Sequence, residues 1–88
     1  MLSPEKFLKE LRLLLPFPEQ KSFLLAVSGG VDSMVLLELF RFHKENHGFS
    51  FEVAHINYGL RGADSDADQN LVEHFCSAHN IPFHLKAL

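Results

Sequence analysis

The sequence has one cysteine, one tyrosine and no tryptophan among its 88 residues. Because a disulfide needs two cysteines, the lone Cys76 excludes an intrachain disulfide and favours a reducing compartment. No apolar run approaches the ~20 residues that a membrane-spanning helix needs. The first residues do not resemble a secretory signal. We therefore expect a cytoplasmic chain without a membrane partner.

An excess of basic residues is also missing. Eight Lys and Arg stand against eleven Asp and Glu, and the net charge is −3 with His neutral. Proteins that bind nucleic acid through their whole surface usually carry a basic patch. If this protein has an RNA partner, most of the RNA-binding surface must therefore lie outside the 88 residues. What the chain does have is nine Phe and 47% hydrophobic residues, which predict a folded core.

Apolar patterning predicts three helices that alternate with three short strands. The helices are expected over residues 4–15, 32–43 and 65–79, and the strands over 21–27, 49–56 and 81–85. Ser3 and Ser65 are candidate N-caps, and Asn80 is a candidate left-handed stop. This order predicts an α/β fold with a parallel sheet in the order 3-2-1. The apolar first strand is typical of a three-layer fold with helices on both faces.

Three strands are few for such a fold, because doubly wound domains usually have five or more. The strands that would lie beyond the first strand are missing. We therefore expect residues 1–88 to be the N-terminal part of a larger domain, with the rest of that domain and any RNA-binding domains absent. The isolated chain should then self-associate or be loosely folded.

The segment between the first strand and the second helix reads Ser28-Gly29-Gly30-Val31-Asp32-Ser33. It is neither a Walker A motif nor Gly-x-Gly-x-x-Gly. Two glycines allow positive φ and a close approach of phosphate to the backbone, and the helix start attracts anions. Asp32 repels phosphate, so its expected role is to hold Mg²⁺ between phosphate groups. The alternative is an ordinary strand-to-helix turn in which an Asp or Ser caps the helix.

This hexapeptide resembles the pyrophosphatase loop of the N-type ATP pyrophosphatases, the PP-loop superfamily. That superfamily includes GMP synthetase, NAD synthetase and several tRNA-modifying enzymes. The resemblance implies an adenine nucleotide alpha hydrolase-like fold and binding of ATP. It also implies adenylation of a carbonyl oxygen with release of pyrophosphate, after which a nitrogen or sulfur nucleophile displaces AMP. The candidate ATP-binding residues are Ser28, Gly29, Gly30, Val31, Asp32 and Ser33.

A second segment, residues 55–68, narrows the resemblance. It is similar to the stretch His-x-Asn-His-Gly-Leu-Arg followed by Ser-x-x-Asp in tRNA(Ile)-lysidine synthetases. Tyr58 departs from that pattern, because many members carry His at this position. From the residues alone, His55 is either a packing residue or a site residue, and Arg61 could bind phosphate or RNA backbone. The matching residues are His55, Asn57, Gly59, Leu60, Arg61, Ser65 and Asp68.

The resemblance implies an ATP-dependent carbon–nitrogen ligase. Its substrates would be a minor isoleucine tRNA with a CAU anticodon and free lysine, which is joined to C2 of the wobble cytidine to form lysidine. Asp32, Arg61 and His55 are the candidate catalytic residues, and ATP and Mg²⁺ are the expected cofactors. One alternative is another PP-loop enzyme, such as a tRNA-thiolating enzyme. The other is a nucleotide-binding module without catalysis, and the 88 residues alone are expected to be inactive.

Overall fold

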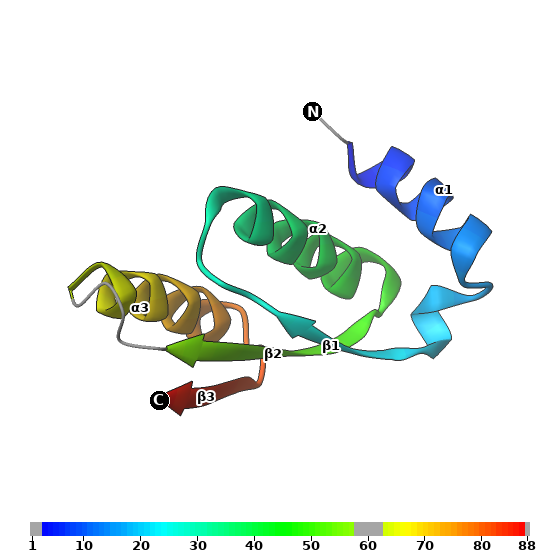
Figure 1. Cartoon of the computed structure of the whole chain (residues 1–88). Helices are drawn as coiled ribbons and strands as arrows, with labels where there is room; N and C mark the ends of the chain where they lie inside the picture. The colour runs from blue at the N-terminus through cyan, green and yellow to red at the C-terminus, as the bar shows by residue number, and fades with distance from the viewer. Residues whose placement is uncertain (1–2, 58–62, 88) are drawn as a thin grey trace.

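The computed structural model describes residues 3–57 and 63–87, which form three α-helices, a short 3₁₀ turn and three parallel strands (Figure 1). The strands lie in the order β1-β2-β3, so β2 is central. The predicted α/β class, parallel sheet and strand order are confirmed. None of the helices in this part of the chain is long and apolar enough to cross a membrane. The elements are α1 (Pro4–Leu14), η1 (Pro18–Gln20), β1 (Ser22–Ala26), α2 (Val31–His47), β2 (Ser50–Asn57), α3 (Ala63–Ala78) and β3 (Phe83–Ala87).

The helix ends follow local sequence signals in most cases. Ser3 caps α1, because its Oγ accepts a hydrogen bond of 3.2 Å from the Lys6 backbone N–H. Gly48 ends α2 with φ at +72°, and Asn80 follows α3 with the predicted left-handed φ of +56°. Ser65 is the exception. Because α3 begins at Ala63, Ser65 lies in its first turn and is not the N-cap.

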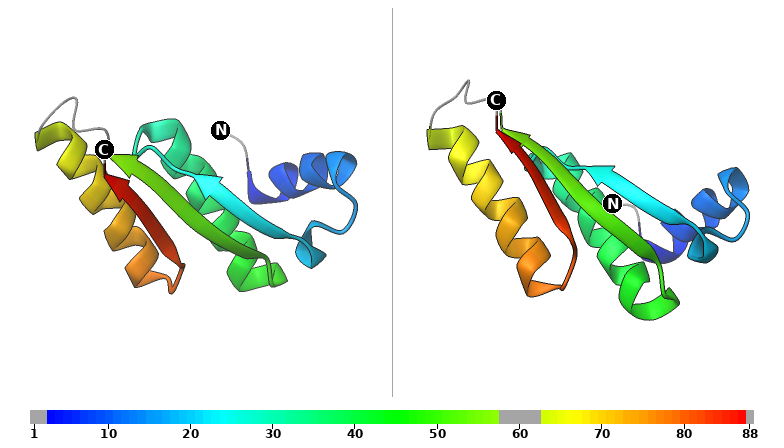
Figure 2. Two further views of the ribbon diagram at one scale, coloured as in Figure 1. Left: turned by 60° about the horizontal axis from the view of Figure 1, so that its bottom comes forward. Right: turned by 90° about the horizontal axis from the view of Figure 1, so that it is seen from below.

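The helices lie on one face of the sheet (Figure 2). Leu25 and Val53 point towards α2 and α3 and are 8% and 0% exposed, whereas Leu24 and Ile56 on the other face are 67% and 48% exposed. The second layer of helices that we expected is therefore not found among the described residues. The strand order explains this. Two successive crossovers that step in the same direction, both right-handed, must place their helices on the same face.

An aromatic cluster fills the space between β1, β2 and α2. Phe40 of α2 lies at its centre, with its ring centroid 5.1 Å from that of Phe23 and 5.6 Å from that of Phe51. Phe7 of α1 reaches the same ring at 5.6 Å. Edge-to-face pairs of this kind stabilise a core beyond the area that they bury. The cluster therefore fixes α2, and with it the loop that precedes α2, on the sheet.

Candidate functional site

The connection from β1 to α2 is short and depends on glycine at one position. Gly29 has φ of +94°, a region that side chains disfavour. A Cβ added at Gly29 would lie 2.8 Å from Cβ and 3.2 Å from Cα of Asp68 in α3. Gly29 therefore permits both the turn and the close approach of α3. Gly30 differs from our expectation of positive φ, because it is the N-cap of α2 with φ of −72°.

The two serines of the loop close it through a chain of hydrogen bonds. The Ser33 hydroxyl accepts from the Gly29 N–H at 3.1 Å and donates to the Gly30 carbonyl at 3.0 Å. Ser28 Oγ accepts from the Gly30 N–H at 3.2 Å and lies 3.2 Å from Ser33 Oγ. Since Ser33 uses its only hydroxyl proton on the carbonyl, Ser28 must donate to Ser33. Both glycine N–H groups therefore donate to serine oxygens within the loop.

The start of α2 adds a positive electrostatic end to this loop. The first N–H groups of a helix have no acceptor within the helix, and they carry about half a positive charge. Asp32 lies exposed in the first turn of α2. A single exposed carboxylate fits Mg²⁺, which proteins often bind through one or two carboxylates together with substrate phosphates. Among the described residues, no three His, Cys, Asp or Glu side chains gather into a metal site of their own.

The carboxyl end of β2 lies beside the base of the loop. His55 is 4% exposed, and its Nδ1 lies 2.7 Å from the Val27 carbonyl oxygen. A carbonyl can only accept, so Nδ1 carries the proton and donates. The structure therefore brings His55 to the strand end from which the loop departs. Our expectation that His55 contacts nucleotide is not tested by this geometry.

Asn57 connects β2 to α3. Its side-chain N–H₂ group donates to Asp66 Oδ1 at 3.1 Å and to Gln69 Oε1 at 2.8 Å. Sequence reasoning missed Gln69, although the three-residue spacing of Asp66 and Gln69 places both on one face of a helix. Arg61 lies outside the described residues, as do Tyr58, Gly59, Leu60 and Gly62.

An apolar groove of about 520 Å³ lies next to Gly29, between α2 and α3. Val31 and Met34 of α2 and Leu71 of α3 line it. A larger hollow of about 680 Å³ lies between α1 and the second half of α2, where His43 lines it. At 1.5 Å per helical residue, that hollow is roughly 18 Å from the start of α2. It is therefore too remote to share a small ligand with the loop.

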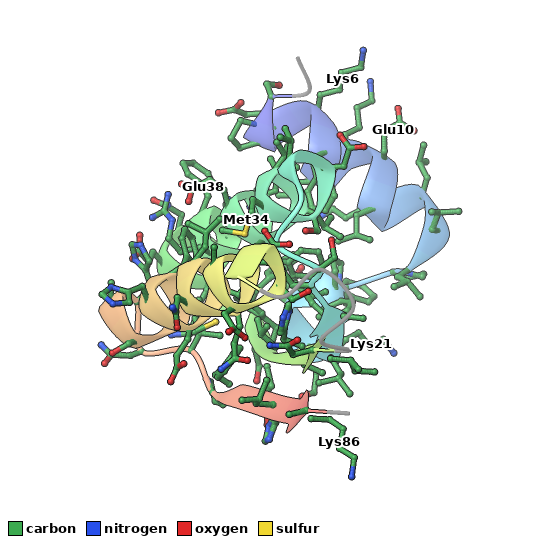
Figure 3. All side chains as sticks on the ribbon, turned by 60° about the vertical axis from the view of Figure 1, so that its left-hand side comes forward. Lys6, Glu10, Lys21, Met34, Glu38 and Lys86 are labelled. Carbon is green, nitrogen blue, oxygen red and sulfur yellow. The ribbon has the colours of Figure 1, made fainter. Side chains whose placement is uncertain are left out.

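Three of the lysines that the structure describes lie far apart on its surface (Figure 3). Lys6, Lys21 and Lys86 project from three different sides of the molecule (Figure 3). Arg41 is engaged by Glu38 and Glu45 on its own helix, which raise the pKa of the guanidinium despite some desolvation. Lys6, Lys21 and Lys86 therefore do not share one cationic surface for a nucleic acid backbone.

Comparison with known proteins gives relatives that are all named tRNA(Ile)-lysidine synthase. The chain is 37% identical over 71 residues to a tRNA(Ile)-lysidine synthase of Streptococcus thermophilus, an alignment that covers 81% of this chain and 17% of the relative. It is 40% identical over 82 residues to that of Chlorobaculum tepidum, covering 93% and 25%. For the Mycoplasmopsis pulmonis protein the identity is 47% over 58 residues, covering 66% and 18%.

The chain thus spans a quarter or less of the length of these curated relatives. A family model for the PP-loop domain matches residues 3–88. This range includes all three strands and the loop of residues 28–33 between β1 and α2, which we call the glycine loop. The resemblance expected from residues 28–33 and 55–68 is confirmed. The chain belongs to the PP-loop domain family.

Proposed function

We propose that this chain is the ATP-binding N-terminal part of a tRNA(Ile)-lysidine synthase. The observation that carries the proposal is the loop at the start of α2, where Gly29 with φ of +94° turns backbone N–H groups towards the helix end. The names of the relatives support the choice of this enzyme within the family. Because they are much longer than this chain, the groups that bind lysine and tRNA are expected outside it.

In the proposed reaction, ATP adenylates the C2 carbonyl oxygen of the wobble cytidine in a minor isoleucine tRNA. The amine of free lysine then displaces AMP, and the product is lysidine. Gly29 and Gly30 would turn their N–H groups from the serine hydroxyls to phosphate oxygens, and Ser28 and Ser33 would donate their hydroxyl protons. These donors and the positive N-terminal end of α2 would stabilise the negative charge that develops on the departing pyrophosphate.

Asp32 would hold Mg²⁺, which neutralises phosphate charge when it is bound. Arg61 remains our candidate for the chemical step, through its planar guanidinium. For His55, the buried contact of its Nδ1 with the Val27 carbonyl favours a structural role over the catalytic role expected from the sequence. Asp32→Asn should reduce turnover by about two orders of magnitude, since it removes a charged group at the phosphates. Glu10→Gln is the matched control, because Glu10 projects into solvent from the outer side of α1 (Figure 3).

The decisive experiment measures pyrophosphate release by the intact protein. We expect release only when isoleucine tRNA with a CAU anticodon and lysine are both present. Release that needs a sulfur donor in place of lysine would indicate a tRNA-thiolating enzyme. Binding of ATP without any turnover would indicate a nucleotide-binding module without catalysis, and either result would reject the proposal.

A further inference from the structure

Val27 is the residue from which the glycine loop departs, and both of its backbone groups are held by β2. The regular pairing of β1 with β2 ends at Ala26 and Ala54. Beyond it, the Val27 N–H still donates to the Ala54 carbonyl at 2.9 Å. The Val27 carbonyl is bound by the imidazole of His55. A side chain thus supplies the donor at the point where the strand pairing stops.

Burial makes this contact costly to lose. Val27 is 3% exposed and His55 is 4% exposed, so water has little access to either partner. A buried carbonyl without a donor is strongly disfavoured, and the chain would shift to find one. The next residues are Ser28 and Gly29, and Gly29 lies so near α3 that an added Cβ would be 2.8 Å from Cβ of Asp68. A small displacement of Val27 would therefore change the position of the loop against α3.

We propose that His55 is a positioning residue, which acts through its Nδ1–H on Val27 and so aims residues 28–33 at phosphate. The expected effect on ATP binding rests on the proposed function. The effect of the His55–Val27 hydrogen bond on the position of the loop does not. It differs from a direct chemical role, in which His55 would act through Nε2. The two roles can be separated because they use different nitrogen atoms of one ring.

The test compares two substitutions in the intact protein. His55→Asn keeps an N–H donor at the position of Nδ1 and has no counterpart of Nε2, whereas His55→Leu removes both nitrogens. We expect His55→Leu to weaken ATP binding by about tenfold, the usual cost of one buried hydrogen bond. His55→Asn should stay within about twofold of the wild type, in both ATP binding and pyrophosphate release. His74→Asn is the control, since His74 is exposed on α3.

Amide NMR spectra without ATP provide a readout that does not depend on the proposed function. The Gly29 and Gly30 amide signals should move in His55→Leu and stay near their wild-type positions in His55→Asn. The ¹⁵N shifts of His55 should show the proton on Nδ1. If the wild type binds no ATP while these signals behave as stated, the proposed function fails and the positioning role stands. Equal loss of turnover in both variants, with unmoved glycine signals, would overturn the positioning role.

Discussion

The two faces of the sheet differ sharply although the same three strands make both. On the helix side, Phe51, Val53 and His55 of β2 are at most 4% exposed. On the other side, Leu24 is 67% and Ile56 48% exposed, and Glu52 pairs with His84 across β2 and β3. The buried face holds Val27, at the start of the loop, through His55. The apolar sequence of a strand therefore does not by itself predict which face of the sheet the helices cover.

Neighbouring leucines of β1 give the largest expected contrast between the two faces. Leu25 is 8% exposed and Leu24 is 67% exposed. We expect Leu25→Ala to lower the free energy of unfolding by about 2–5 kcal/mol, because it leaves a cavity in the core. Leu24→Ala should change it by less than about 0.5 kcal/mol. Urea unfolding of both variants measures this, and equal losses would mean that the open face is covered in solution.

Two glycines with positive φ provide the next contrast. Gly29 meets Asp68, whereas a Cβ at Gly48 would have no atom within 4 Å. Gly48→Ala should cost about 1 kcal/mol, the penalty of the left-handed backbone alone. Gly29→Ala should cost about 2 kcal/mol or more, because strain and the clash with α3 add, and it should also weaken ATP binding. Thermal unfolding and calorimetric titration test this, and equal effects on stability would argue against the close packing of α3 on the loop.

A buried histidine on the helix side predicts a pH dependence. His43 is 1% exposed, its Nε2 donates to the Pro4 carbonyl at 3.0 Å, and its Nδ1 has no hydrogen-bond partner among residues 3–57 and 63–87. Burial lowers the pKa of His43. A histidine in the unfolded chain has a pKa of about 6.5, so as the pH falls the unfolded chain takes up the proton before the folded chain does. The stability that the buried, neutral His43 contributes is therefore lost below about pH 6.5.

His43→Gln is the matched variant, since its amide can donate to Pro4 without titrating. Urea unfolding at pH 7.5 and 5.5 should show a smaller loss of stability in His43→Gln than in the wild type. His84→Gln on the open face serves as the control, because His84 and Glu52 form an exposed pair of little value to stability. If the pH dependence follows His84 instead, the assignment to His43 is wrong.

The smallest expected effect concerns association of the chain through its open face. Exposed apolar residues on that face, together with the unpaired edge of β1, favour self-association of the isolated 88 residues. Leu24→Lys should shift sedimentation towards the monomer without lowering the free energy of unfolding. A wild-type chain that sediments as a monomer and melts cooperatively would contradict this prediction.

Much of the candidate site was predictable from short-range signals. Positive φ at Gly29 and the junction of strand, loop and helix follow from residues 23–37, because turn chemistry is local. Placement of His55 at the neighbouring strand end follows from parallel strand order. The hydrogen bond from His55 Nδ1 to the Val27 carbonyl could not be predicted from the sequence, because it joins residues 28 positions apart. The bonds from Asn57 to Asp66 and Gln69 were equally hidden, because they depend on how α3 returns to β2.

Local sequence was sufficient for the number and order of the α-helices and strands and for the parallel sheet, because periodicity and turn residues act over a few positions. Membership in the family followed from the resemblance of residues 28–33 and 55–68. Tertiary structure decided the rest. It placed every described helix on one face of the sheet, brought the backbone of Asp68 against Gly29 and bound His55 to Val27. These contacts arise where separate elements pack, and there the available volume and unpaired backbone groups, rather than local propensity, select the partner.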